Sequence, residues 1–306
     1  MNESIHVAPE VADALASGRA VVALESTLIT HGLPHPTNVE TALAMEAAVR
    51  ESGAVPATIA VLRGKITVGI SAKDIERLAG LPRDRVRKCS RRDLPIAAAL
   101  GEDASTTVAA TLIVAQLAGI GIFATGGIGG VHRGHPFDVS ADLVELGRNP
   151  VAVVCSGAKA ILDLPLTVEV LETQGVAILG YMTSTFPGFY TRSTGLPVDV
   201  TVQTPEEAAR IIAAARRLGT RQGLLVAVPV PEPDALPNDQ VERAVAAALS
   251  EAESRGIRGK AVTPFLLERV AELSGGTSRR ANISLLVNNA RVAGRIASAL
   301  CRMAGP

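Results

Sequence analysis

The chain has 306 residues, of which 47% are hydrophobic and 2% aromatic, and its 30 basic and 30 acidic residues leave no formal net charge. Nucleic acids and anionic membranes select proteins with a basic excess or patch, so this balance argues against both as main partners. The shortage of aromatic rings also removes the usual platform for stacking nucleic-acid bases. Any anionic ligand is therefore expected to be a small molecule bound at a local site.

Short apolar runs alternate along the chain with segments of helical periodicity. The runs are continuously apolar, which is typical of strands buried on both faces of a sheet. The expected strands are 20–25, 57–63, 121–125, 151–156, 176–181 and 224–230, and the expected helices are 11–18, 38–53, 106–119, 141–149 and 205–219. A mostly helical part follows from 239 to 303. This alternation predicts an α/β fold with three α/β/α layers around a central, mostly parallel sheet.

The chain is expected to form one domain over residues 1–306 in the cytoplasm. The Pro-rich stretch 229–239 is the best candidate boundary, but it directly follows a strand, and a loop that carries site residues is the favoured interpretation. The N-terminus lacks the features of a signal peptide, and glycines divide the uncharged stretch 104–131. The widely spaced Cys89, Cys155 and Cys301 form no CxxC pair and are expected to be reduced thiols.

In α/β sheets, ligands bind beyond the carboxyl ends of the strands, so polar residues that follow apolar runs are candidates for function. Glu25 closes the first run and could act as a general acid if its surroundings raise its pKa. The alternative is a structural ion pair at a strand end. His31 and His35 have a metal-like spacing, but Gly32 and Pro34 between them argue against a helical zinc site.

A glycine-rich segment, TGGIGGVHRGHPFDVSADL, spans residues 125–143. Its backbone amides could approach an anion closely, although it matches neither the dinucleotide fingerprint nor the P-loop. Asp138 could bind a hard divalent cation through oxygen, or it could be a turn residue. Ser140 is predicted to be the N-cap of the helix 141–149, and Asp142 is suited to its first turn.

Two further segments carry basic residues. Lys159 follows the strand VAVVCS and a Ser-Gly turn, where a neutral amine could attack a carbonyl, whereas a surface lysine is the alternative. Arg87, Lys88, Arg91 and Arg92 form a local positive cluster that suits phosphate, with a solvated loop as the alternative. The aromatic loop 186–190 could cover a flat ligand or could be ordinary packing.

Together these segments resemble the pseudouridine-5′-phosphate glycosidase family, also called the indigoidine synthase A-like family. The resemblance extends in order over nearly the whole chain. One departure is a shorter loop between Gly134 and Phe137. The matching stretches are ALESTLITHGLPHPTN, PATIAVLRGKITVG, KCSRRDLP, DASTTVAAT, ATGGIGGVHRG, FDVSADLVEL, VCSGAKAILDLP, GYMTSTFPGFYTRSTG and NISLLVNNA.

The resemblance implies reversible cleavage of the C–C glycosidic bond of pseudouridine 5′-phosphate to uracil and ribose 5-phosphate, through a lysine–sugar imine. It also implies a homotrimer and a divalent cation, typically manganese. It gives Glu25 as the proton donor, Lys159 as the covalent nucleophile and Asp138 as the metal ligand. The implied substrate contacts are Lys88, Val108, Ser140, Ala141, Asp142 and Asn289.

Two other functions are compatible with the same residues. A Schiff-base aldolase or lyase that acts on another phosphosugar would use the same lysine and basic cluster, but it would not release uracil. A non-catalytic sugar-phosphate binding protein would bind its ligand without turnover. The placement of Glu25, Asp138 and Lys159 beyond strand ends favours an enzyme.

Overall fold

This computed structural model describes residues 5–259 and 262–304. Its centre is a sheet of eleven strands. Its order is β1-β4-β3-β2-β7-β10-β14-β12-β13, and β6 pairs with β3 and β5 beside this path. Neighbours from β3 to β13 are parallel, whereas β4 and β6 run antiparallel to β3. The strands are β1 (Ile5–Val7), β2 (Val21–Leu24), β3 (Val55–Leu62), β4 (Lys65–Val68), β5 (Arg87–Cys89), β6 (Ala104–Thr106), β7 (Ile122–Ala124), β10 (Ala152–Cys155), β12 (Ile178–Tyr181), β13 (Val200–Val202) and β14 (Leu224–Ala227).

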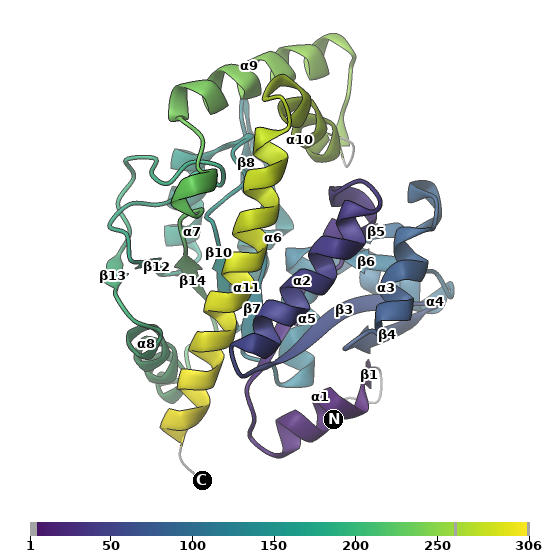
Figure 1. Cartoon of the computed structure of the whole chain (residues 1–306), viewed down its shortest axis with the longest axis vertical. Helices are drawn as coiled ribbons and strands as arrows, with labels where there is room; N and C mark the ends of the chain where they lie inside the picture. The colour runs from purple at the N-terminus through teal and green to yellow at the C-terminus, as the bar shows by residue number, and fades with distance from the viewer. Residues whose placement is uncertain (1–4, 260–261, 305–306) are drawn as a thin grey trace.

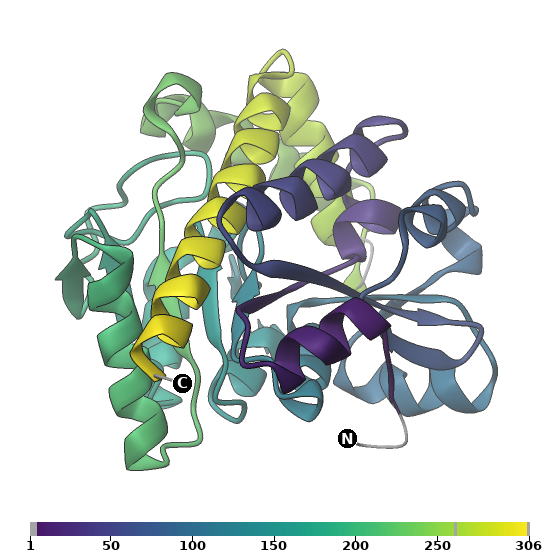
Figure 2. The ribbon, with the colours of Figure 1, turned by 60° about the horizontal axis from the view of Figure 1, so that its bottom comes forward.

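Helices cover both faces of this sheet, so the predicted three-layer α/β/α fold is confirmed. In Figure 1, α2 and α11 lie in front of the strands, and α5 and α6 lie behind them. The turned view of Figure 2 shows α11 running beside both α2 and α8. The helices are α1 (Pro9–Ala16), α2 (Thr37–Glu51), α3 (Ala72–Ala79), α4 (Leu94–Ala99), α5 (Val108–Ala118), α6 (Ala141–Leu146), α7 (Leu164–Thr173), α8 (Pro205–Leu218), α9 (Asn238–Ser254), α10 (Val262–Leu273) and α11 (Thr277–Ala304).

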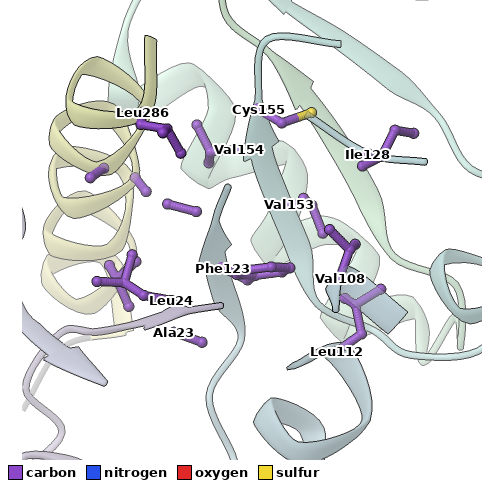
Figure 3. Packing of buried hydrophobic residues seen from close by; sticks show 14 of the residues in the cluster. Ala23, Leu24, Val108, Leu112, Phe123, Ile128, Val153, Val154, Cys155 and Leu286 are labelled. Atoms are coloured by element: carbon purple, nitrogen blue, oxygen red, sulfur yellow. The ribbon is translucent and has the colours of Figure 1, made fainter. Parts of the chain in front are cut away.

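The core lies where the central strands meet α5 and α11. Every residue of β2, β7, β10 and β14 is buried, as their continuously apolar sequences predict. Figure 3 shows Phe123 of β7 between Leu286 of α11 and Val108 of α5. Each fully buried aliphatic or aromatic side chain of this kind contributes about 1.5–3 kcal/mol to folding. These strands therefore form a rigid base for the loops that follow them.

The predicted strands and helices are confirmed, with ends shifted by a few residues, and the structure adds several short elements. The additional strands β1, β5, β6 and β13 have three residues each, too few for a periodic signal. Strand β4 and helices α3, α4 and α7 were also not predicted, although Ser71 and Asp74 form a capping box at the N-terminus of α3. Within the described residues, no helix is both long and apolar enough to cross a membrane.

The glycine-rich segment contains more regular structure than expected. A small antiparallel sheet has the order β11-β8-β9, from β11 (Leu162–Asp163), β8 (Val131–His132) and β9 (His135–Val139). All five residues of β9 are exposed, and the side chain of Phe137 is 99% exposed. This sheet pairs the glycine-rich segment with the chain that follows Lys159, so it holds two candidate segments together.

Candidate active site

A cavity of about 540 Å³ opens beyond the carboxyl ends of β2, β7 and β10. The start of α5, strand β5, the β8–β9 hairpin and α10 complete its wall. Of the predicted site residues, eight line this cavity: Glu25, Lys88, Val108, Asp138, Ser140, Ala141, Asp142 and Lys159. The fold therefore brings together residues that lie far apart in the sequence.

Glu25 follows the last residue of β2 and is buried, with 9% of its surface exposed. The hydroxyl of Thr125, at the end of the neighbouring strand β7, donates a hydrogen bond to its carboxylate. Burial raises the pKa of Glu25 above its usual value, and this effect outweighs the opposing effects of Lys159, the Thr125 hydrogen bond and Lys88. A carboxyl group with a raised pKa retains its proton to higher pH, as a general acid requires.

Lys159 lies on the loop that leaves β10. Its backbone amide donates to the carbonyl of Ile128 at 3.1 Å, which ties this loop to the glycine-rich segment. The turn before it depends on Gly157, whose φ is +77° and where a Cβ atom would lie 2.1 Å from the carbonyl oxygen of Pro187. The turn thus fixes where the lysine enters the cavity. Cys155, directly below, is fully buried, and burial raises the pKa of its thiol to about 12, so it stays protonated near neutral pH.

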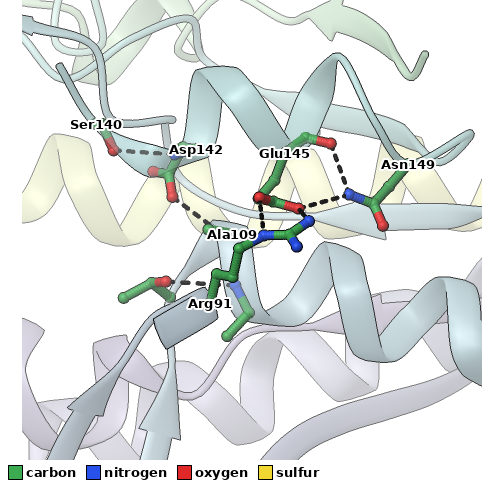
Figure 4. A network of polar contacts seen from close by, with 8 residues as sticks. Arg91, Ala109, Ser140, Asp142, Glu145 and Asn149 are labelled. Atoms are coloured by element: carbon green, nitrogen blue, oxygen red, sulfur yellow. Dashed lines mark hydrogen bonds and ion pairs between the residues drawn. The ribbon is translucent and has the colours of Figure 1, made fainter. Parts of the chain in front are cut away.

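Asp142 connects two parts of the cavity wall (Figure 4). Its carboxylate accepts from the amides of Ala109 at 2.9 Å and Gly129 at 2.8 Å, so it ties the start of α5 to the glycine-rich segment. Ser140 is the N-cap of α6, as predicted, and accepts from the amide of Asp142 at 3.2 Å. A side chain at Gly129 would lie 2.3 Å from the Ser140 hydroxyl, which explains why only glycine fits there.

Two arginines of the basic cluster form ion pairs with glutamates, and three of its four residues line the cavity. Arg87 binds Glu102, and Arg91 binds the buried Glu145 (Figure 4). Arg91 also lines the cavity, together with Lys88 and Arg92. The positive charge of Lys88 also acts on Glu25, which places this lysine near the acid.

The N-terminus of α5 faces the same cavity through Thr107 and Val108. Thr107 caps the helix by accepting from the amide of Ala110. Only 1% of Val108 is exposed, and its amide, at the first helical position, has no intrahelical acceptor. Val108 is therefore suited to contact an anion through its backbone rather than its side chain.

Asp138 lies on the exposed strand β9 at the edge of the cavity, and its side chain is 61% exposed. The Nδ1 of His132 lies 3.9 Å from the Asp138 Oδ2. Within the described residues, no three His, Cys, Asp or Glu side chains form a group that could hold a metal ion. A hard divalent cation fits this donor set only with water molecules as most of its ligands.

Asn289 is placed differently from the other predicted substrate contacts. It is fully buried on α11 and does not line the cavity. Its Nδ2 donates to the carbonyl of Thr125 at 2.9 Å and to the hydroxyl of Ser156 at 3.1 Å. Its contacts are thus with the ends of β7 and β10, beneath the cavity.

Asn282, Phe189 and His31 are among the cavity residues that were not assigned to the site from the sequence. Asn282 lies on α11 and is half-buried, and Phe189 comes from the aromatic loop. His31 lines the cavity, with its Nδ1 2.6 Å from the Thr30 hydroxyl, whereas His35 is exposed and lies outside it. Asn282, Leu286 and Asn289 are spaced to share one face of a helix, and this spacing is the sequence signal that could have assigned Asn282 to the site.

The sequence profile described as indigoidine synthase A like protein matches residues 10–299. The chain belongs to the indigoidine synthase A-like family. The resemblance seen in the sequence is thus confirmed.

Relatives in this family are similar over their full length. A protein of Hahella chejuensis named pseudouridine-5′-phosphate glycosidase is 53% identical over 302 residues, covering 97% of this chain and 99% of its own. A protein of Escherichia coli K12 with the same name is 50% identical over 305 residues, covering 99% and 97%.

Two solved structures share the fold. The prealnumycin C-glycosynthase AlnA, in complex with ribulose 5-phosphate, has a TM-score of 0.91 and 42% identity, and the match covers 99% of each chain. An indigoidine synthase A-like protein from Thermotoga maritima has a TM-score of 0.89 and 36% identity, and the match covers 97% of each chain.

Proposed function

We propose that this chain is an enzyme that reversibly cleaves the C–C glycosidic bond of pseudouridine 5′-phosphate to give uracil and ribose 5-phosphate. The observation that carries the proposal is the shared cavity of Glu25, a buried acid, and Lys159, an amine. Relatives named pseudouridine-5′-phosphate glycosidase support the substrate. AlnA, a C-glycosynthase that binds ribulose 5-phosphate, supports the chemistry.

The reaction begins with opening of the ribose ring. Ring carbon C5 of uracil is a poor leaving group, so direct expulsion of the base as in N-glycosidases is unfavourable. Glu25 donates its proton to the ribose ring oxygen, and the bond between that oxygen and C1′ breaks. The Lys159 nitrogen then forms a bond to C1′.

The second stage breaks the C–C bond. Uracil C5 takes up a proton, and the nitrogen lone pair of Lys159 forms a C=N bond as the bond from C1′ to C5 breaks. Uracil leaves with the proton and the electron pair, and a protonated imine remains on the sugar. Addition of water to C1′ releases ribose 5-phosphate and restores the amine.

The cavity lining offers groups for both parts of the substrate. Lys88, the amide of Val108 and Ser140 would bind the phosphate through charge and hydrogen bonds. Asn282 offers a donor and an acceptor for the edge of the base, and Phe189 and Leu286 offer apolar contacts. Ala141 and Asp142 complete the wall near the glycine-rich segment.

Asp138 would bind a divalent cation, manganese or another hard ion, together with water molecules. Such an ion supplies positive charge that orients phosphate or sugar oxygens.

The exposed strand β9, with Phe137 at its centre, supports association between copies of the chain. The homotrimer implied by the family stays a proposal that light scattering in solution measures.

Purified protein should release uracil from pseudouridine 5′-phosphate, detected by chromatography, and should form pseudouridine 5′-phosphate from uracil and ribose 5-phosphate. A chelator should lower the rate, and added Mn²⁺ should restore it, because a single carboxylate binds a cation weakly. Sugar adducts without uracil would instead support an aldolase. A rate that the chelator does not change would contradict the cation at Asp138.

Replacing Lys88 with methionine should raise KM for pseudouridine 5′-phosphate about 10- to 100-fold, the loss expected for one charge-assisted hydrogen bond. Methionine is also unbranched and nearly as long, and it removes the charged ammonium group with its hydrogen-bond donors. Steady-state kinetics with phosphorylated and unphosphorylated pseudouridine measures the effect. An equal rise of KM for both substrates would contradict a role in phosphate binding.

A further inference from the structure

Asn289 connects helix α11 to the ends of two central strands. Its Nδ2 lies within hydrogen-bonding distance of the carbonyls of Thr125, at 2.9 Å, and Gly126, at 3.4 Å. The same group lies 3.1 Å from the hydroxyl of Ser156, which in turn lies 3.3 Å from the Asn289 Oδ1. Asn289 and Ser156 are both fully buried, so every one of these polar groups depends on the others for its hydrogen bonds.

Each of the two strand ends leads to a catalytic group. Thr125, at the end of β7, donates its hydroxyl hydrogen to the carboxylate of Glu25. Ser156 begins the turn that carries Lys159, and its amide donates to the carbonyl of Gly126 at 2.9 Å. A single amide side chain thus fixes the backbone on which both the acid and the nucleophile depend.

The hydroxyl of Thr125 favours the ionised form of Glu25, as do the positive charges of Lys159 and Lys88, whereas burial and the negative charge of Asp142 disfavour it. Among these groups, Thr125 is the one that donates a hydrogen bond directly to the carboxylate. Thr125 is also fully buried, although it lines the cavity beside Glu25.

We propose that Thr125 and Asn289 act together as positioning residues, with Asn289 holding the end of β7 so that the Thr125 hydroxyl orients the proton-donating carboxyl of Glu25. The inference rests on the proposed function and assigns Asn289 a role beneath the cavity rather than in direct contact with substrate. It gives α11 a second role, because Asn282 and Leu286 of the same helix line the cavity.

Replacing Thr125 with valine tests the hydroxyl with little change of shape. Glu25 must be protonated to donate, so kcat falls as pH rises through its pKa, and loss of the hydrogen bond raises that pKa. The alkaline limb of the kcat–pH profile should move up by about half to one pH unit. Thr125→Ser, which retains the hydroxyl, should keep the limb at the wild-type position.

Replacing Asn289 with alanine tests the amide. The alkaline limb should move in the same direction, and kcat should fall about 10- to 100-fold with little change in KM, because the groups are displaced rather than removed. Asn288→Ala is the matched control, since Asn288 precedes it on α11 and does not line the cavity. The double variant Thr125→Val/Asn289→Ala should show the same limb as Thr125→Val alone, because both changes break one linkage.

An unmoved limb in Thr125→Val, or an Asn289→Ala variant that loses thermal stability without any change of the limb, would overturn the inference. A rise in KM with unchanged kcat in Asn289→Ala would also overturn it and favour direct substrate contact. Failure of the proposed function is a separate result, because it appears as absence of uracil release from the wild-type protein.

Discussion

Replacing Lys159 with alanine should abolish uracil release both with and without Mn²⁺, because the nitrogen that bonds to C1′ is gone. Without that nitrogen, no lone pair can form the imine as the C–C bond breaks. Borohydride added during turnover of the wild-type protein should reduce the imine and leave a stable sugar phosphate on the enzyme. Peptide mass spectrometry should place this adduct on Lys159 and on none of the other four lysines of the sequence.

Two variants serve as controls for this result. Lys73→Ala, at an exposed position of α3, should keep both the rate and the adduct. Lys88→Met should still form the adduct at high substrate concentration, because its effect is on binding. Full activity in Lys159→Ala, or an adduct on another lysine, would contradict the covalent mechanism.

The central part of the fold was predictable because burial on both faces leaves a strong sequence signal. Runs such as VVAL in β2 and AVVC in β10 are continuously apolar, and the structure buries every residue in them. Strand β5, by contrast, has the sequence RKC, and two of its three residues are only half-buried. Its position depends on pairing with β6, a tertiary contact that local sequence does not reveal.

The site was predictable residue by residue where a side chain follows a strand, and less so on helices. Glu25 directly follows β2 and Lys159 lies on the loop that leaves β10, so the carboxyl ends of parallel strands bring them together. On α11, however, Asn282 lines the cavity and Asn289 lies two turns further along, beneath it. Sequence pattern gives the face of a helix, but it does not give the depth at which each residue meets the sheet.

The ion pairs of the basic cluster also could not be predicted from the sequence. Four basic residues within six positions suggested a phosphate site, but Arg91 binds Glu145, which lies 54 positions away. A buried carboxylate of this kind needs a partner, because an unpaired charge in the interior is costly. Only the three-dimensional fold shows that Arg91 has this structural partner although it lines the cavity beside Lys88.

Replacing Glu25 with glutamine should lower uracil release about 10²- to 10⁴-fold, the usual contribution of a general acid. Glutamine can still accept from the Thr125 hydroxyl, so the change removes the proton and keeps the local geometry.

The same substitution should raise the free energy of unfolding above pH 4.5, although it lowers activity. Burial raises the pKa of Glu25 above 4.5, so the stability that its neutral form contributes is complete below that pH and is lost as pH rises through the pKa of the folded state.

Glutamine has no ionisable group, so the variant does not lose stability as Glu25 would ionise. Its free energy of unfolding, measured by urea denaturation, should exceed that of the wild type by a margin that grows with pH. The margin is about 1.4 kcal/mol for each unit by which folding raises the pKa. Glu46 on α2 is the matched control: burial raises its pKa too, the Thr58 hydroxyl donates to it at 2.5 Å, and it does not line the cavity. Glu46→Gln should therefore reproduce the stability trend and keep the rate. A Glu25→Gln variant that kept the wild-type rate would contradict the role of Glu25 as proton donor, because that role is what distinguishes Glu25 from Glu46 in this comparison.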